Sequence, residues 1–255
     1  MFGINPMEKE LNFKVSPEIY PPEKEKENRA TIWEHYFARK IAFLILPIFL
    51  KLKISANQVS VLSIITGIVG TILIAVGNFW QMFLGAILIQ IWLILDKTDG
   101  LIARYRKNVS SLGKFLEELN GTTIAALFFS SIGFAASKFP GLPVSVQNLP
   151  SIFFIILGVL TSSFVIFRQL IFNYFEAIFT KEKKIKSETL LETGLLSTFY
   201  KITLKFSGIY SLAQPIFILA ISFNFLGLYI LFYFFLQFLI MLVNIIFLSF
   251  KAAEL

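Results

Sequence analysis

The sequence predicts an all-α, polytopic membrane protein with six transmembrane helices preceded by an N-terminal interfacial amphipathic helix. The 255 residues are 56% hydrophobic and include 30 Phe, which excludes an ordinary soluble domain. Several apolar runs reach the roughly 20 residues that a bilayer-spanning helix needs. The short alternating segments of a β-barrel are absent. Because the chain has no cysteine, disulfides and zinc–thiolate sites are excluded.

The first 53 residues are predicted to form two different segments. Residues 1–30 contain four Pro residues and mixed charges but no apolar signal-peptide core, so we expect a flexible cytoplasmic arm. In residues 31–53, Lys and Arg flank an apolar stripe at helical spacing, formed by Trp33, Phe37, Ile41, Leu44 and Ile48. This pattern predicts a helix lying on the membrane, with a short first span as the alternative. Pro47 is expected to kink or break this helix.

Six apolar runs then predict one six-helix transmembrane domain over residues 54–255. Short connections containing Asn78, Pro140-Gly141 and Asn224 separate them on one side of the membrane. The longer link at 181–205 lies on the other side. The runs cover about 57–77, 79–104, 110–138, 151–179, 206–223 and 226–250.

The distribution of Lys and Arg predicts the orientation. Twenty of them flank the runs on the side of the N-terminus, the 181–205 loop and the C-terminus, whereas the opposite side has only Lys138. Positive residues favour the cytoplasmic side, so both termini are expected there. The net charge of +7 is explained in the same way, together with anionic lipid headgroups, and no nucleic-acid partner is expected.

Charged residues at 96–121 interrupt this apolar pattern and are the candidate functional site. Placing an ionisable side chain at membrane depth costs free energy, so each such residue is by default a candidate functional residue. At about 100° per residue, one helix face carries Asp96, Asp99, Gly100 and Ala103. A face of the next helix carries Gly113, Glu117, Asn120 and Gly121.

The residue types on these two faces indicate a metal–phosphate site. Oxygen-only ligands suit Mg²⁺ or Mn²⁺, and Arg104 adds a planar cation suited to phosphate. The small residues Gly100, Ala103 and Gly113 leave room for a ligand. The combination implies a metal-bridged pyrophosphate at the cytoplasmic boundary and a displacement at phosphorus.

This stretch resembles the signature of the CDP-alcohol phosphotransferases (CDP-alcohol phosphatidyltransferases), Asp-x2-Asp-Gly-x2-Ala-Arg-x(7–8)-Gly-x3-Asp-x3-Asp. The resemblance covers roughly residues 31–250. Asn57 stands where many members have Pro-Asn, although the Pro is absent here. Six positions match in identity and spacing, namely Asp96, Asp99, Gly100, Ala103, Arg104 and Gly113.

The resemblance implies a transferase that moves a phosphatidyl-type group from a CDP-alcohol, such as CDP-diacylglycerol, to an acceptor alcohol. CMP leaves, and a phospholipid or related phosphodiester forms. By position, Asp96, Asp99 and Glu117 would bind one or two Mg²⁺ or Mn²⁺ ions. Homodimers are common in the family. The resemblance does not identify the acceptor alcohol. Residues expected to bind substrate are Asn57, Gly100, Ala103, Arg104, Gly113 and Asn120.

The second half of the signature departs from the family pattern. Glu117 replaces the third Asp, and Gly121 stands where most members have an Asp that binds a second metal and acts as base. Asn120 offers an amide oxygen but cannot act as a base at neutral pH. Three explanations remain: an enzyme with a weaker second metal site, an enzyme with an unusual acceptor, or a non-catalytic member that binds a CDP-alcohol or lipid without turnover.

Two further residues carry weaker hypotheses. Arg168, inside the fourth run, is expected to bind an acceptor phosphate or lipid headgroup, with snorkelling or a structural ion pair as the alternative. His35, the single histidine, is a candidate replacement base, although an interfacial role beside Trp33 and Tyr36 is favoured. A transporter is disfavoured, because the sequence has no clear repeat and its charges gather at one boundary.

Overall fold

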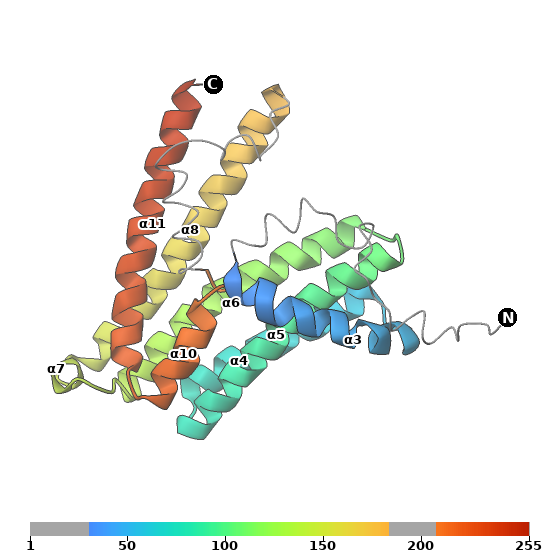
Figure 1. Cartoon of the computed structure of the whole chain (residues 1–255). Helices are drawn as coiled ribbons and strands as arrows, with labels where there is room; N and C mark the ends of the chain where they lie inside the picture. The colour runs from blue at the N-terminus through green and yellow to red at the C-terminus, as the bar shows by residue number, and fades with distance from the viewer. Residues whose placement is uncertain (1–30, 184–207, 255) are drawn as a thin grey trace.

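The computed structural model describes residues 31–183 and 208–254, and all regular secondary structure in these ranges is helical (Figure 1). The all-α prediction is therefore confirmed for this part of the chain. The expected arm at 1–30 and the loop at 184–207 lie outside the described residues. The helices are η1 (Glu34–Ala38), α3 (Arg39–Lys51), α4 (Ala56–Val76), α5 (Phe79–Tyr105), α6 (Ser111–Lys138), α7 (Val144–Gln147), α8 (Ser151–Lys183), α10 (Ala213–Ser222) and α11 (Leu226–Glu254).

Five helices in the described ranges are long and apolar enough to cross a membrane. They are α4, α5, α6, the Ser151–Phe175 part of α8 and the Leu226–Phe250 part of α11. The chain is thus an integral membrane protein. In the expected span at 206–223, residues 209–212 form turns, and the 10-residue helix α10 follows. At about 1.5 Å per residue, α10 covers half of a hydrocarbon core of roughly 30 Å. The count of six spans therefore stays a prediction.

The segment expected to lie on the membrane is the π-helical turn η1 followed directly by α3. Pro47 does not break α3, which continues to Lys51, so of the two expected effects a break is wrong and a kink stays a prediction. Ala42 and Leu46 before the proline, and Phe49 and Leu50 after it, pack in a cluster with residues of α4 and α5 and hold the helix on both sides of the proline. Leu44 is 76% exposed, so part of the predicted apolar stripe faces outward, and its contact with lipid remains a prediction.

Side-chain caps set the starts of three membrane helices. Ser55, Asn78 and Ser110 each accept a hydrogen bond from a backbone N–H in the first turn of α4, α5 and α6. At Ser55 and Asn78 a glutamine three residues later bonds back to the cap, which completes a capping box. These caps explain why the observed helices begin within one residue of the predicted runs.

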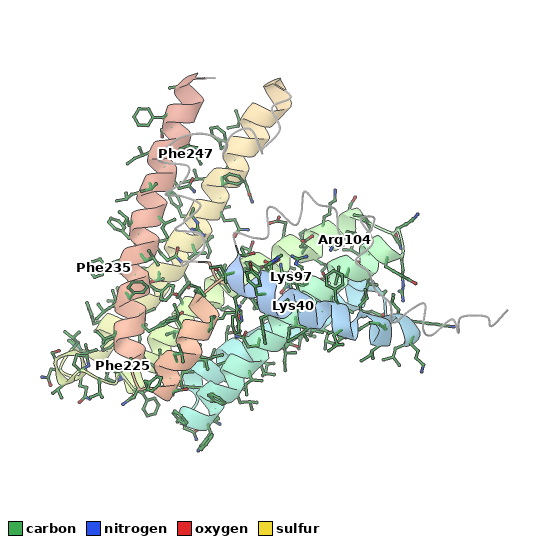
Figure 2. The ribbon with its side chains drawn as sticks, in the orientation of Figure 1. Lys40, Lys97, Arg104, Phe225, Phe235 and Phe247 are labelled. Atoms are coloured by element: carbon green, nitrogen blue, oxygen red, sulfur yellow. The ribbon has the colours of Figure 1, made fainter. Side chains whose placement is uncertain are left out.

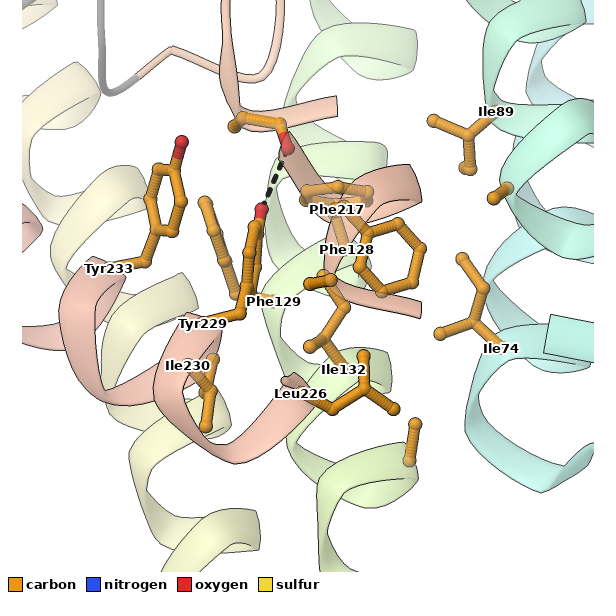
Figure 3. Packing of buried hydrophobic residues seen from close by; sticks show 14 of the residues in the cluster. Ile74, Ile89, Phe128, Phe129, Ile132, Phe217, Leu226, Tyr229, Ile230 and Tyr233 are labelled. Atoms are coloured by element: carbon orange, nitrogen blue, oxygen red, sulfur yellow. Dashed lines mark hydrogen bonds between the residues drawn. The ribbon is translucent and has the colours of Figure 1, made fainter. Parts of the chain in front are cut away.

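The helices α4, α5 and α6 pack against one another, and α6 continues the packing to α8 and α11. Figure 1 shows α8 and α11 running side by side, at an angle to the first three. Aromatic rings fill the junction, where Phe128 of α6 packs edge-on against Phe217 of α10 (Figure 3). The Tyr229 hydroxyl of α11 donates a hydrogen bond of 2.9 Å to the carbonyl of Ala213.

Two of the predicted short connections meet at one end of the bundle. The Leu142 N–H donates to the Asn224 carbonyl at 2.7 Å, and the Gly227 N–H donates to the Pro140 carbonyl at 2.7 Å. Gly141 and Asn224 both have positive φ, at 78° and 57°, as tight turns require. Because α6 ends here, its other end and the charged residues of 96–117 lie at the opposite end of the bundle.

Candidate functional site

A cavity of about 200 Å³ lies where α4 begins, α5 ends and α6 begins. Its wall also includes the link between α5 and α6, at Asn108, Val109 and Ser110. These three helix ends come together because α4 packs against both of the other helices. Most of the residues predicted from the sequence line this cavity: Asn57, Asp99, Gly100, Ala103, Arg104, Gly113 and Glu117.

The cavity combines positive groups with two carboxylates. The N-termini of α4 and α6 both reach its wall, and helix N-termini favour anions. The Arg104 guanidinium lies over Gly100, since a Cβ at that glycine would be 3.3 Å from Nη1 and Nη2. Lys114 lines the wall as well, opposite in charge to Asp99 and Glu117. The positive groups suit a phosphate ligand, and the two carboxylates suit a metal cation bound to that phosphate.

Asp99 is the carboxylate most firmly fixed at the cavity. It is buried, and its Oδ2 accepts a hydrogen bond of 2.5 Å from the Ser60 hydroxyl of α4. Ser60 is not among the residues predicted from the sequence, although it lies three residues after Asn57 and so on the same face of a helix. Ser60 therefore sets the orientation of Asp99 from a neighbouring helix.

Asp96 lies one turn earlier in α5 and does not line the cavity. Its Oδ1 accepts a hydrogen bond of 2.7 Å from the Asn120 amide, and its Oδ2 contacts the Lys97 ammonium at 2.9 Å. Asn120 also donates to Ser63 at 2.8 Å and accepts from the Trp92 indole at 2.7 Å. The fully buried Asn120 thus joins α4, α5 and α6 behind the cavity, away from the position at which substrate was expected.

Lys97 is the centre of a charged cluster that sequence reasoning missed. Its ammonium lies 3.5 Å from Glu34 Oε2, in addition to the contact with Asp96, and 4.3 Å from the centre of the Tyr210 ring. Glu34 also pairs with Arg39. Burial by itself raises the pKa of Glu34, but Lys97 and then Arg39 outweigh it, so the pKa lies below its usual value. Figure 2 shows Lys97 in the middle of the bundle, beside α3.

The space beside Gly121 is filled by Tyr210. A Cβ at Gly121 would lie 2.9 Å from the Tyr210 hydroxyl, with no other described atom within 4 Å apart from its own helix backbone and chain neighbours. The Tyr210 ring also packs on Trp92, with ring centres 5.5 Å apart. The ordinary pKa of a phenol is about 10, and burial raises the pKa of Tyr210 further. The hydroxyl therefore stays protonated at neutral pH and does not replace the missing base.

This contact predicts a coupling between Gly121 and Tyr210. Gly121→Ala is expected to lower the melting temperature of the detergent-solubilised protein, because overpacking typically costs about 1–3 kcal/mol. Tyr210→Phe removes the atom that the new methyl group would meet. The double variant should therefore be more stable than the sum of the single effects predicts. Strictly additive losses would contradict the contact.

Two residues with weaker hypotheses do not line the cavity. His35 lies in η1 and packs edge-on against Tyr36, with ring centres 4.8 Å apart. Arg168 is half-buried in α8, a helix that contributes nothing to the cavity wall. Neither position supports a direct role at Asp99, and the functional hypothesis for Arg168 remains a prediction.

The donor set of the cavity is suitable for one divalent cation. In the described ranges, no three His, Asp or Glu side chains converge as metal ligands. However, Mg²⁺ is commonly held by one or two carboxylates, with substrate phosphates and water completing the shell. Asp99 and Glu117 on one cavity wall meet that requirement. A second ion at Asp96 does not fit this arrangement, because both Asp96 oxygens already have partners.

Comparison with known proteins agrees with this geometry. A family model described as CDP-alcohol phosphatidyltransferase matches residues 53–250. The match includes all of α4, α5 and α6, and therefore every residue of the cavity wall. No curated protein matches the chain.

Proposed function

Because the chain belongs to the CDP-alcohol phosphatidyltransferase family, we propose that it moves a phospho-alcohol group from a CDP-alcohol to an acceptor alcohol and releases CMP. The observation that carries this proposal is the cavity in which Asp99, Glu117 and Arg104 meet two helix N-termini. A diphosphate needs positive groups, and a cation bound to it needs carboxylates. The cavity offers both within about 200 Å³.

Each residue of the wall then has a role in binding. Arg104 and the two helix N-termini would bind the diphosphate, and the small side chains of Gly100, Ala103 and Gly113 would leave room for the nucleotide. Asp99, fixed by Ser60, and Glu117 would hold Mg²⁺ or Mn²⁺. When bound, such an ion neutralises diphosphate charge and stabilises the leaving phosphate.

The reaction exchanges one phosphorus–oxygen bond for another. The acceptor hydroxyl oxygen bonds to the phosphorus that carries the alcohol, the bond from this phosphorus to the CMP oxygen breaks, and the acceptor proton passes to water. Gly121 supplies no carboxylate to take that proton. General-base help is worth about 10²–10⁴-fold, so slow turnover is expected with an ordinary hydroxyl acceptor.

The cavity and both termini are proposed to face the cytoplasm. The support is the excess of Lys and Arg on the side of the bundle where α4 begins and α5 ends. CDP-linked alcohols and divalent cations would then reach the cavity from the cytoplasm, while lipid substrates would enter from the membrane.

The test is release of CMP by the purified full-length chain in detergent. CDP-diacylglycerol and water-soluble CDP-alcohols would be tried as donors, each with glycerol phosphate, inositol phosphate and sugar-like alcohols as acceptors. We expect CMP release that depends on Mg²⁺ or Mn²⁺ and stops when a chelator is added. If no pair releases CMP from well-folded protein, transferase activity is refuted.

A second candidate function is binding of a CDP-alcohol or lipid without turnover. The observation in its favour is that Tyr210 fills the space beside Gly121, where a catalytic carboxylate would stand. This function predicts saturable binding of CDP with no CMP release from any donor. The same panel, combined with a CDP-binding titration, therefore separates the two candidates.

A further inference from the structure

Lys97 holds a positive charge against Asp96 inside the bundle. Its ammonium contacts Asp96 Oδ2 at 2.9 Å and Glu34 Oε2 at 3.5 Å, so it lies between two carboxylates from different helices. The Lys97 side chain is 17% exposed, and those of Asp96 and Glu34 are 3% and 5% exposed. A cation held this way is a fixed part of the site.

Tyr210 completes the surroundings of this cation. Its ring lies under the Lys97 ammonium at 4.3 Å, an arrangement that attracts cations. Its hydroxyl occupies the space next to Gly121. One side chain therefore both supports the ammonium and fills the volume that a carboxylate at 121 would need.

The charges of the cluster balance without a metal ion. Asp96 and Glu34 are the acids, and Lys97 and Arg39 are the bases that contact them. A divalent ion added at Asp96 would leave this buried group with an excess of positive charge, which is unfavourable away from water. Among the ion pairs of the described residues, neither Asp99 nor Glu117 at the cavity contacts a Lys or Arg in this way.

We propose that the Lys97 ammonium takes the place of a second divalent cation beside Asp96, so that the chain binds one ion with its CDP-linked ligand. The inference rests on the proposed function, because it concerns the same cavity and ligand. It also distinguishes the two carboxylates of α5: Asp99 is directed to the exchangeable ion, whereas Asp96 holds a cation that belongs to the protein.

The test counts Mn²⁺ ions bound per full-length chain in detergent at saturating CDP, from the electron paramagnetic resonance signal of free Mn²⁺. One ion is expected for the wild type and for Lys97→Arg. Lys97→Ala should bind two, because it leaves the carboxylates of Asp96 and Glu34 around a cation-sized gap. Lys40→Ala, which removes the same charge from an exposed position on α3, should stay at one.

The ion counts test this inference separately from the proposed transferase function. Two ions in the wild type would overturn the inference and leave the transferase proposal standing. No ion in the wild type would overturn both. If Lys97→Ala binds only one Mn²⁺, the Lys97 ammonium does not take the place of a second divalent cation, and the inference is refuted. If Lys97→Ala does not fold, the counts for the wild type and Lys97→Arg still decide, since two ions in either would refute the inference.

Discussion

Asp99→Asn is expected to slow divalent-dependent CMP release strongly. The substitution removes the negative charge from the buried carboxylate that lines the cavity, but it keeps the shape of the side chain and an oxygen for Ser60. Losing several kcal/mol of charge stabilisation by a bound cation corresponds to a rate loss of roughly 10²–10⁴-fold. The measurement is the initial rate of CMP formation at saturating donor, acceptor and Mg²⁺.

Glu118→Gln is the matched control for Asp99→Asn. Glu118 is exposed, follows Glu117 directly and does not line the cavity. We expect its rate to remain within about twofold of the wild type, because an exposed charge outside the site makes little difference. Melting temperatures of both variants would show that each is folded. Full activity in Asp99→Asn would contradict a role for Asp99 in the metal site, whereas a loss in Glu118→Gln would show that the rate responds to charges outside the cavity.

The cavity wall was predictable because a helix fixes the angular position of each side chain. Once 79–104 is helical, Asp99, Gly100 and Ala103 must share a face, and the observed helix α5 directs all three to the cavity. The caps at Ser55 and Ser110 likewise set where α4 and α6 begin. Local rules of helix geometry therefore locate the wall without knowledge of the packing.

The cluster around Lys97 was not predictable by the same rules. It joins Glu34, Lys97 and Tyr210, which are far apart in the sequence and come from three separate segments. Helical periodicity gives the face of a residue but not the neighbour on that face. Asn120 illustrates the limit: it shares a face with Glu117, yet it lies one turn deeper and bonds to Asp96 behind the cavity.

Gly158→Val is expected to cause a large loss of stability. A Cβ at Gly158 would lie 2.6 Å from the Phe129 carbonyl oxygen and 2.7 Å from the Gly133 Cα, so α6 and α8 touch backbone to backbone there. Valine would force the helices apart. At the upper end of overpacking, about 3 kcal/mol, the melting temperature should fall by roughly 6–12 °C. Thermal unfolding followed by size-exclusion chromatography in detergent measures this fall.

Ser163→Val tests whether the effect at Gly158 arises from the backbone contact. Ser163 lies on an exposed part of the same helix, where valine meets no backbone, so its melting temperature should be unchanged. Because α8 does not line the cavity, the Gly158→Val protein that remains folded should bind CDP with wild-type affinity. A weakened affinity would show that the contact between α6 and α8 positions Gly113 and Glu117 at the cavity as well as stabilising the bundle.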